Sequence, residues 1–182
     1  MWNILDNMIA DGRAEECIVV MACGYSFYPD GSSNSAISSF GEEMIQDIVP
    51  FVDGHYRTIA NKNSRAMAGL SMGGGFQTQY TAFHYPEVLG NVGIFSAFFI
   101  IQDEDDDYTE ILYHKDRFGD TYRYMFLGIG EQDYRMYDED VKRIGILQKE
   151  YHIPIDFYHV PGIHDWTFWR KAMVKFLEKV FK

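Results

Sequence analysis

The chain has 182 residues, of which 47% are hydrophobic and 16% aromatic, and this composition is typical of a globular protein rather than a disordered one. Its 16 basic and 27 acidic residues give a net charge of −11, which argues against nucleic acid or an anionic membrane surface as the main partner. No apolar run approaches the roughly 20 residues of a membrane span. We therefore expect a single domain, residues 1–182, with no membrane partner.

Strand-like and helix-like patterns alternate along the chain. The predicted strands are 17–23, 64–68, 91–97, 122–129 and 153–160; the predicted helices are 2–10, 39–52, 74–84, 138–151 and 166–181, with a short helix from the acidic run 103–107 to residue 114. We expect Pro50 to bend the last turn of its helix. The alternation predicts an α/β fold: a mostly parallel sheet of about five strands, flanked by helices.

The first predicted strand contains both cysteines, Cys17 and Cys23. Its continuous apolar character is typical of a strand that is buried on both faces. Extended, the two cysteines would be about 20 Å apart, whereas a disulfide needs Cα atoms within about 7 Å. We therefore predict two buried free thiols. The first residues lack the pattern of a signal peptide, which leaves the compartment unknown.

The pentapeptide Gly69-Leu70-Ser71-Met72-Gly73 lies between a predicted strand and a predicted helix. A Gly-x-Ser-x-Gly motif in that context predicts the nucleophile elbow of an α/β-hydrolase. We expect side chains at positions 69 and 73 to collide with neighbouring backbone, which glycine avoids. The helix that follows would aim its amide groups at the reaction centre, and the Met72 amide would be one oxyanion donor. A glycine-rich turn without catalytic function is the alternative.

A serine nucleophile needs a histidine base and an acid that orients it, and in α/β-hydrolases these follow in the order serine, acid, histidine. Asp133 follows the fourth predicted strand and His164 follows the fifth, so both lie in the expected loops. Glu131 is an alternative acid. Asp165 is expected to cap the last helix instead, and His164 could also be a structural loop histidine.

With these positions placed, the chain resembles the esterase D / feruloyl esterase group, carbohydrate esterase family one, of the α/β-hydrolases. The resemblance is carried by residues 3–9 with 18–21, 48–52 with 56–57, 68–74, and 162–166 with Trp169. It implies serine ester hydrolysis with Ser71 as nucleophile, His164 as base and Asp133 as acid. Members of this group remove feruloyl or acetyl groups from xylan, hydrolyse S-formylglutathione or transfer mycolyl groups, and they are often secreted.

The chain departs from the resembled family at its start. The family's first strands, and the His-Gly loop that supplies the second oxyanion donor, have no counterpart here. One missing strand would lie between the strands that match 17–23 and 65–70. If those two strands pair directly, Gly24 or Tyr25 could supply the second donor. A second copy of the chain could instead complete the sheet as a homo-oligomer, or the chain could be a fragment.

Aromatic residues suggest where a substrate would bind. Trp166 is adjacent to Asp165 and close to the expected base, while Tyr25 and Phe98 lie in two loops expected near the site. Ordinary packing is the alternative for each. The run 103–107 lacks the ligand spacing of a calcium loop, and we expect no metal and no cofactor.

These observations predict a serine carboxylesterase that acts on feruloyl or acetyl esters of xylan-type plant polysaccharides. Two alternatives remain open. One is a non-catalytic carbohydrate-binding or interaction protein that is derived from a hydrolase. The other is a small-molecule esterase or thioesterase, such as an S-formylglutathione hydrolase.

Overall fold

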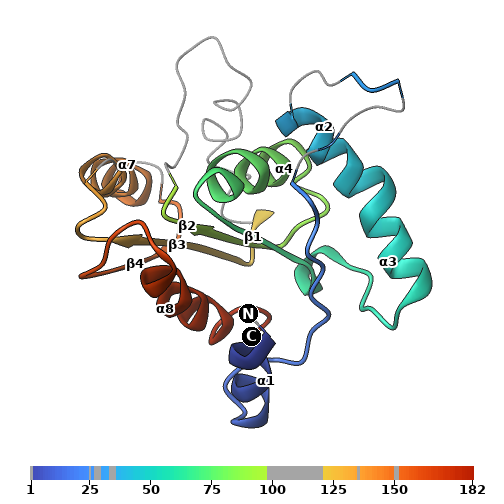
Figure 1. Cartoon of the computed structure of the whole chain (residues 1–182), viewed down its shortest axis with the longest axis horizontal. Helices are drawn as coiled ribbons and strands as arrows, with labels where there is room; N and C mark the ends of the chain where they lie inside the picture. Colours follow the sequence, from blue (N-terminus) through green and yellow to red (C-terminus); the bar gives the residue numbers. More distant parts are fainter. Residues whose placement is uncertain are drawn as a thin grey trace.

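A four-stranded parallel sheet organises the chain (Figure 1). The computed structural model describes residues 2–24, 26, 30–32, 36–97, 121–134, 136–149 and 152–182. The strands β1 (Ala66–Leu70), β2 (Asn91–Phe95), β3 (Tyr124–Gly130) and β4 (Ile155–Val160) lie side by side in chain order. The predicted α/β class is confirmed, with four strands in the described part of the chain.

Helices cover both faces of this sheet (Figure 1). They are α1 (Trp2–Ala10), α2 (Ala36–Glu43), α3 (Val49–His55), α4 (Gln79–His84), α7 (Tyr137–Lys149) and α8 (Trp166–Leu177). The helices α4 and α7 lie on one face and α1 and α8 on the other. In the described part of the chain, no helix combines the length and the apolar character that crossing a membrane requires.

Each face of the sheet has its own hydrophobic core. On the first face, Phe83 of α4 and Ile144 of α7 pack against Ile94 and Leu127 of the sheet. On the second face, Phe126 of β3 packs within the cluster that α1 and α8 share, and its ring lies 5.9 Å from that of Phe176. All residues of β2 are buried, as are all but the first of β3, because these two central strands are covered on both sides.

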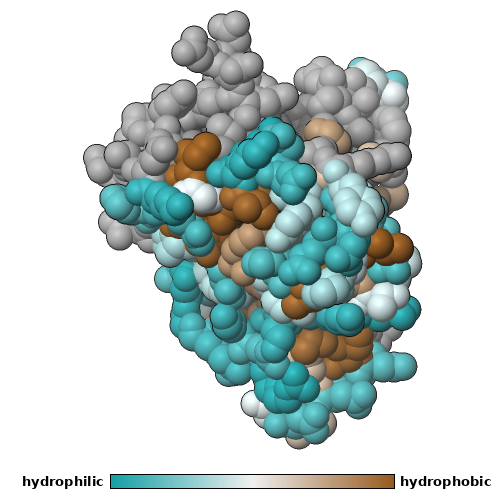
Figure 2. Space-filling view, turned by 90° about the vertical axis from the view of Figure 1, so that its left-hand side faces the viewer, coloured by the Kyte–Doolittle hydropathy of each residue, from teal (hydrophilic) through white to brown (hydrophobic). Residues whose placement is uncertain are grey.

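The two outer strands of the sheet have different surroundings. On the β4 side, charged and hydrogen-bonding side chains such as Glu131, His159 and Lys179 keep the surface mostly hydrophilic, with separate apolar patches (Figure 2). Charged side chains at a sheet edge disfavour pairing with another chain. On the β1 side, Ala68 in the middle of the strand is exposed. Among the described strands, β1 pairs only with β2.

The strand predicted at 17–23 is wrong. This segment belongs to no strand of the sheet, although it runs past the β1 side of the molecule (Figure 1). Its side chains still alternate: Cys17 and Val19 are partly buried against the α1–α8 core, whereas Ile18 and Val20 are each 50% exposed. The residues have the preference for a strand, but a strand also needs a neighbour that accepts and donates its backbone hydrogen bonds.

Both cysteines are free, as predicted, but they are not both buried. Cys23 is exposed, and Cys17 is partly buried, which raises the pKa of its thiol through desolvation. The prediction of full burial failed because it depended on a strand inside the sheet.

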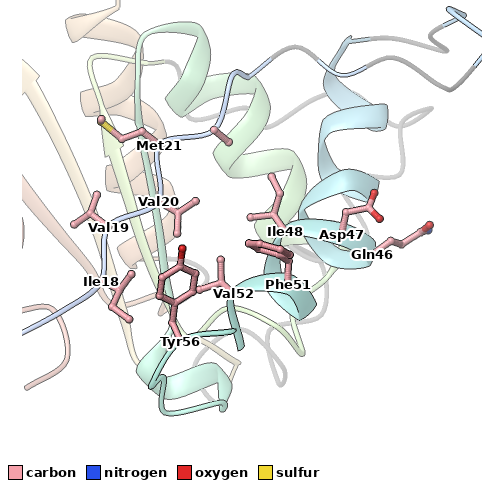
Figure 3. Close-up of a pocket in the computed structure, with 11 residues that line it drawn as sticks. Ile18, Val19, Val20, Met21, Gln46, Asp47, Ile48, Phe51, Val52 and Tyr56 are labelled. Carbon is pink, nitrogen blue, oxygen red and sulfur yellow. The ribbon is translucent and has the colours of Figure 1, made fainter. Parts of the chain in front are cut away.

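A groove separates the 17–23 segment from the helical segment that precedes β1. It has a volume of about 750 Å³. Figure 3 shows Ile18 to Met21 on one wall, and Ile48, Phe51 and Tyr56 on the other. Phe51 and Tyr56 are more than half exposed, at 56% and 55%. The groove is therefore an open apolar surface in this structure.

The helix predicted at 39–52 is longer than expected and contains an irregular turn. It extends from Ala36 to His55, with a π-helical turn at Met44–Ile48, where the Val49 amide donates to the Met44 carbonyl. Pro50 lies at the start of α3 and has no amide hydrogen to donate to the preceding turn. The irregularity therefore lies just before Pro50, rather than as a bend in the last turn.

Several other predictions about elements can be compared with the structure. The helix at 2–10 and the strands at 91–97, 122–129 and 153–160 are confirmed within a few residues. The helix that follows the elbow begins with a π-helical turn, Gly73–Thr78, before α4. The short helix predicted from the acidic run at 103–107 lies outside the described residues.

Candidate active site

Ser71 occupies a strained turn directly after β1. Its φ of 52° lies in the left-handed region, which non-glycine residues seldom adopt. Three hydrogen bonds hold it there: its amide donates to the Phe95 carbonyl (2.8 Å), and its carbonyl accepts from Gly74 (3.1 Å) and Gly75 (2.9 Å). The turn therefore fixes the serine at the carboxyl end of the sheet, with a helix starting behind it.

The glycines of the elbow do not all have the steric role that the motif predicts. A Cβ atom at Gly69 would collide with the Gly73 carbonyl, and one at Gly74 would lie 2.6 Å from the Gly69 carbonyl oxygen. A Cβ atom at Gly73 would meet no heavy atom within 4 Å. The expected collision is thus confirmed at position 69 and wrong at position 73, because the strand and the helix approach each other through Gly69 and Gly74.

His164 contacts Ser71 and Asp133 at the same time. Its Nε2 lies 3.0 Å from the Ser71 hydroxyl oxygen, and its Nδ1 lies 2.8 Å from Oδ2 of Asp133. An ionised carboxylate only accepts hydrogen bonds, so Nδ1 donates to Asp133, and Nε2 is left free to accept from the serine hydroxyl. The structure thus brings together the three side chains that the sequence analysis selected.

The Asp133 side chain is 3% exposed and that of His164 is 35% exposed. Asp133 lies just before α7, where its carbonyl accepts from the amides of Met136 and Tyr137 (3.0 Å each). A buried carboxylate is costly without a partner, and His164 supplies one. The Asp133 carboxylate is therefore fixed inside the protein, while the His164 imidazole reaches the surface.

The alternative acids have other partners. Glu131 contacts Nδ1 of His159 at 3.1 Å, on the outer side of β4, and does not contact His164. Asp165 caps α8, as predicted, by accepting from the Phe168 amide at 2.9 Å. This hydrogen bond holds the pKa of the Asp165 carboxyl below its usual value.

The expected oxyanion donors are only partly described. Met72 is the first residue of the helix after Ser71, and amides in a first helical turn have no partner within the helix. The Gly24 carbonyl accepts from Nε2 of Gln77 (2.9 Å), which places Gly24 beside the same helical segment. Residues 17–23 do not pair with β1, which was the condition under which Gly24 or Tyr25 could supply the second donor. Tyr25 lies outside the described residues.

Exposed apolar side chains flank the Ser71–His164 pair. Met72 is 59% exposed, Ile163 is 54% exposed and Trp166 is 61% exposed. The ring of Trp169 lies between two others: its centroid is 5.1 Å from that of His164 and 5.2 Å from that of Trp166, both in T-shaped arrangements. Trp166 is therefore available to a ligand and Trp169 packs against the imidazole. Phe98 lies outside the described residues.

Sequence reasoning missed Gln132, which connects the two loops that carry Asp133 and His164. Its amide donates to the Gly162 carbonyl (2.9 Å), and its Oε1 accepts from the Gly162 amide (2.6 Å). The only signal in the sequence was its place directly before the expected acid.

The parallel sheet, the strained serine turn and the order of the contacting residues define an α/β-hydrolase fold. The chain belongs to the esterase family described as "Putative esterase", whose model matches residues 4–180.

One relative is likewise named as an esterase. The chain is 28% identical, over 98% of its length, to an endo-1,4-beta-xylanase/feruloyl esterase from Xylanibacter ruminicola, and it spans 23% of the length of that protein.

Solved structures with the same fold include a ferulic acid esterase (TM-score 0.73, 22% identity, 99% of this chain and 77% of that one). Another is the ferulic acid esterase of Anaeromyces mucronatus in complex with ferulic acid (TM-score 0.74, 22% identity, 96% of this chain and 69% of that one). An S-formylglutathione hydrolase from Staphylococcus aureus is less similar (TM-score 0.61, 20% identity, 81% of this chain and 64% of that one).

The contrast between two elbow glycines gives a direct test of the packing. We expect Gly69→Ala to lower the free energy of unfolding by about 1–3 kcal/mol or more, because the new methyl group meets backbone that cannot move aside. We expect Gly73→Ala to leave it unchanged within about 0.5 kcal/mol or to raise it slightly. Urea unfolding of both variants checks this, and equal losses would contradict the steric assignment.

Proposed function

We propose that the chain is a serine carboxylesterase that works through an acyl-enzyme. The observation that carries the proposal is the continuous hydrogen-bonded path from the Ser71 hydroxyl through His164 to the buried Asp133. A serine hydroxyl is a weak nucleophile until a neighbouring base accepts its proton, and this arrangement supplies that base together with an acid that orients it.

In the proposed reaction, Nε2 of His164 takes the hydroxyl proton while Ser71 Oγ bonds to the ester carbonyl carbon. The resulting oxyanion accepts a hydrogen bond from the Met72 amide, and Gly24 or Tyr25 is proposed to supply a second donor. His164 then returns the proton to the leaving alcohol as the carbon–oxygen bond of the ester breaks. Water attacks the acyl-serine by the same steps in reverse and releases the acid and the free Ser71.

The nucleophile and the acid are tested by single substitutions. With p-nitrophenyl acetate, we expect Ser71→Ala to lower kcat/KM by at least about 10³-fold, and Asp133→Asn to lower it on the order of 10³-fold. Glu131→Gln is the matched control, because it makes the same carboxylate-to-amide change two residues away on a side chain that contacts His159. It should leave the rate within about 3-fold, a change below 1 kcal/mol in transition-state stabilisation. Release of p-nitrophenol that is no faster with the wild-type chain than with Ser71→Ala would contradict the proposal and favour a binding protein.

For the substrate, we propose feruloyl or acetyl esters on xylan-type plant polysaccharides. The relative from Xylanibacter ruminicola is named for feruloyl esterase as well as xylanase activity, and the Anaeromyces mucronatus enzyme was solved with ferulic acid. The exposed Trp166 supports the proposal, because an aromatic side chain beside the base offers a flat face to a phenolic or sugar ring.

The choice of substrate is tested by comparing kcat/KM for feruloylated arabinoxylan, acetylated xylan and S-formylglutathione. We expect one of the two polysaccharide esters to be the best substrate, and we expect Trp166→Ala to raise KM for it while leaving p-nitrophenyl acetate turnover nearly unchanged. A preference for S-formylglutathione would replace the polysaccharide by a small thioester.

We further propose that a second copy of the chain covers the edge of β1 that pairs with no other described strand, together with the adjoining apolar groove. The exposed groove residues Ile18, Val20 and Phe51 support this, because apolar surface exposed in such a concentration favours association. Light scattering of the purified chain should return the mass of a dimer or higher oligomer, and Val20→Lys should shift it to the monomer mass. A monomer at all concentrations would contradict this proposal.

A further inference from the structure

The loops that carry Asp133 and His164 continue the pairing of β3 and β4 beyond the ends of those strands. The last registered pair of the sheet is Gly130 with Val160. After it, the Glu131 amide donates to the Val160 carbonyl (3.0 Å). The Gln132 amide then donates to the Gly162 carbonyl (2.9 Å). The two loops therefore remain hydrogen-bonded to each other beyond the ends of the strands.

A side chain then takes the place of backbone in this pairing. Oε1 of Gln132 accepts from the Gly162 amide at 2.6 Å, in a part-buried position. The peptide groups of Gly162 are thus held on both sides by one residue, which acts as a clamp. The two loops are also closely packed here, because a Cβ atom at Gly130 would collide with the Gly162 carbonyl. An acceptor at the end of the Gln132 side chain is therefore matched to a single backbone donor.

The clamp lies next to two residues of the candidate site. Gln132 directly precedes Asp133, and Gly162 lies two residues before His164. Away from the clamp, each loop is attached to a different helix: Asp133 accepts from amides at the start of α7, and Asp165 caps α8. Relative movement of the two helices would change the 2.8 Å contact between Asp133 and His164. The clamp opposes that movement, because it joins the two loops that carry Asp133 and His164.

The geometry points to Gln132 as a positioning residue that sets the distance between the Asp133 carboxylate and the His164 imidazole. Its side chain holds the Gly162 amide, and it acts on the site through Asp133 and His164. This inference rests on the proposed function for its catalytic consequence, but the Asp133–His164 hydrogen bond that it concerns is a property of the fold. Misplacement of a catalytic group by about 1 Å can cost about 10²-fold in rate.

The test compares Gln132→Met, which keeps the length of the side chain and removes the strong acceptor, with Gln132→Glu, which keeps the acceptor. Gln148→Met is the matched control: the side chain of Gln148 also bonds to backbone, with Nε2 donating to the carbonyl of Ile155 at 2.8 Å, but at the opposite end of β4. Four quantities are measured: kcat and KM for p-nitrophenyl acetate, the melting temperature, and the downfield proton NMR resonance of the His164 Nδ1–H group.

We expect Gln132→Met to lower kcat by about 10–100-fold with little change in KM, and to weaken or broaden the Nδ1–H resonance. Gln132→Glu should restore most of kcat and the resonance. Gln148→Met should lower the melting temperature by a similar amount without changing kcat or the resonance. An unchanged kcat and resonance in Gln132→Met would overturn the inference, and so would an equal loss of kcat in Gln148→Met.

The NMR resonance tests the Gln132 clamp independently of the proposed esterase function. If the wild-type chain has no Ser71-dependent turnover, the proposed function fails. A resonance that is lost in Gln132→Met and kept in Gln132→Glu and Gln148→Met would still support the clamp. If Gln132→Met fails to fold, Gln132→Glu decides: a resonance and kcat close to wild type support the role of the acceptor, and their loss in a folded Gln132→Glu variant overturns it.

Discussion

The parallel alignment of four strands is the constraint on which the rest of the structure depends. Because β1 to β4 are parallel and lie side by side, the residues that follow them meet at the carboxyl end of the sheet. Ser71 follows β1, Asp133 follows β3 and His164 follows β4, so residues separated by up to 93 positions meet within hydrogen-bond distance. Burial of β2 and β3 on both faces keeps this alignment rigid.

The sheet and its helices also stabilise the strained backbone at Ser71 and the buried carboxylate of Asp133. A non-glycine residue at positive φ costs on the order of 1–3 kcal/mol, and Ser71 is held in that conformation by a hydrogen bond to β2 and by two from the helix behind it. The buried Asp133 is stabilised in a similar way, since the start of α7 fixes its backbone and His164 satisfies its carboxylate. The strained and charged parts of the site therefore depend on elements that pack elsewhere.

The two outer strands of the sheet differ in whether a further strand could pair with them. At β4, polar and charged side chains such as Asp156 and Lys179 form their own contacts and discourage further pairing. At β1, an extended apolar segment and the groove lie where the sheet could continue, and Ile18 and Val20 remain half exposed. In the described part of the chain, the β4 edge thus carries charged contacts, whereas the β1 edge pairs with no further strand.

Much of this protein could be predicted from the sequence, because the relevant signals are local. Local sequence patterns predicted the α/β class and each of the four described strands to within about two residues at either end. The Gly-x-Ser-x-Gly motif selected Ser71, and chain order selected Asp133 and His164, the three residues that the structure brings together. The cap formed by Asp165 was also predictable, because a cap depends only on the helix that follows it.

Other features were decided by tertiary structure. Residues 17–23 have the composition of a buried strand, but whether they form one depends on a neighbour that composition does not describe. The choice between Asp133 and Glu131 depended on which carboxylate faces the interior and which faces His159. The steric roles of Gly73 and Gly74, and the contact between Gln132 and Gly162, depend on how closely two segments approach. Sequence by itself determined most of the elements and the residue types of the candidate site; the distances between these residues were set by packing, because distances between remote segments exist only once the sheet has formed.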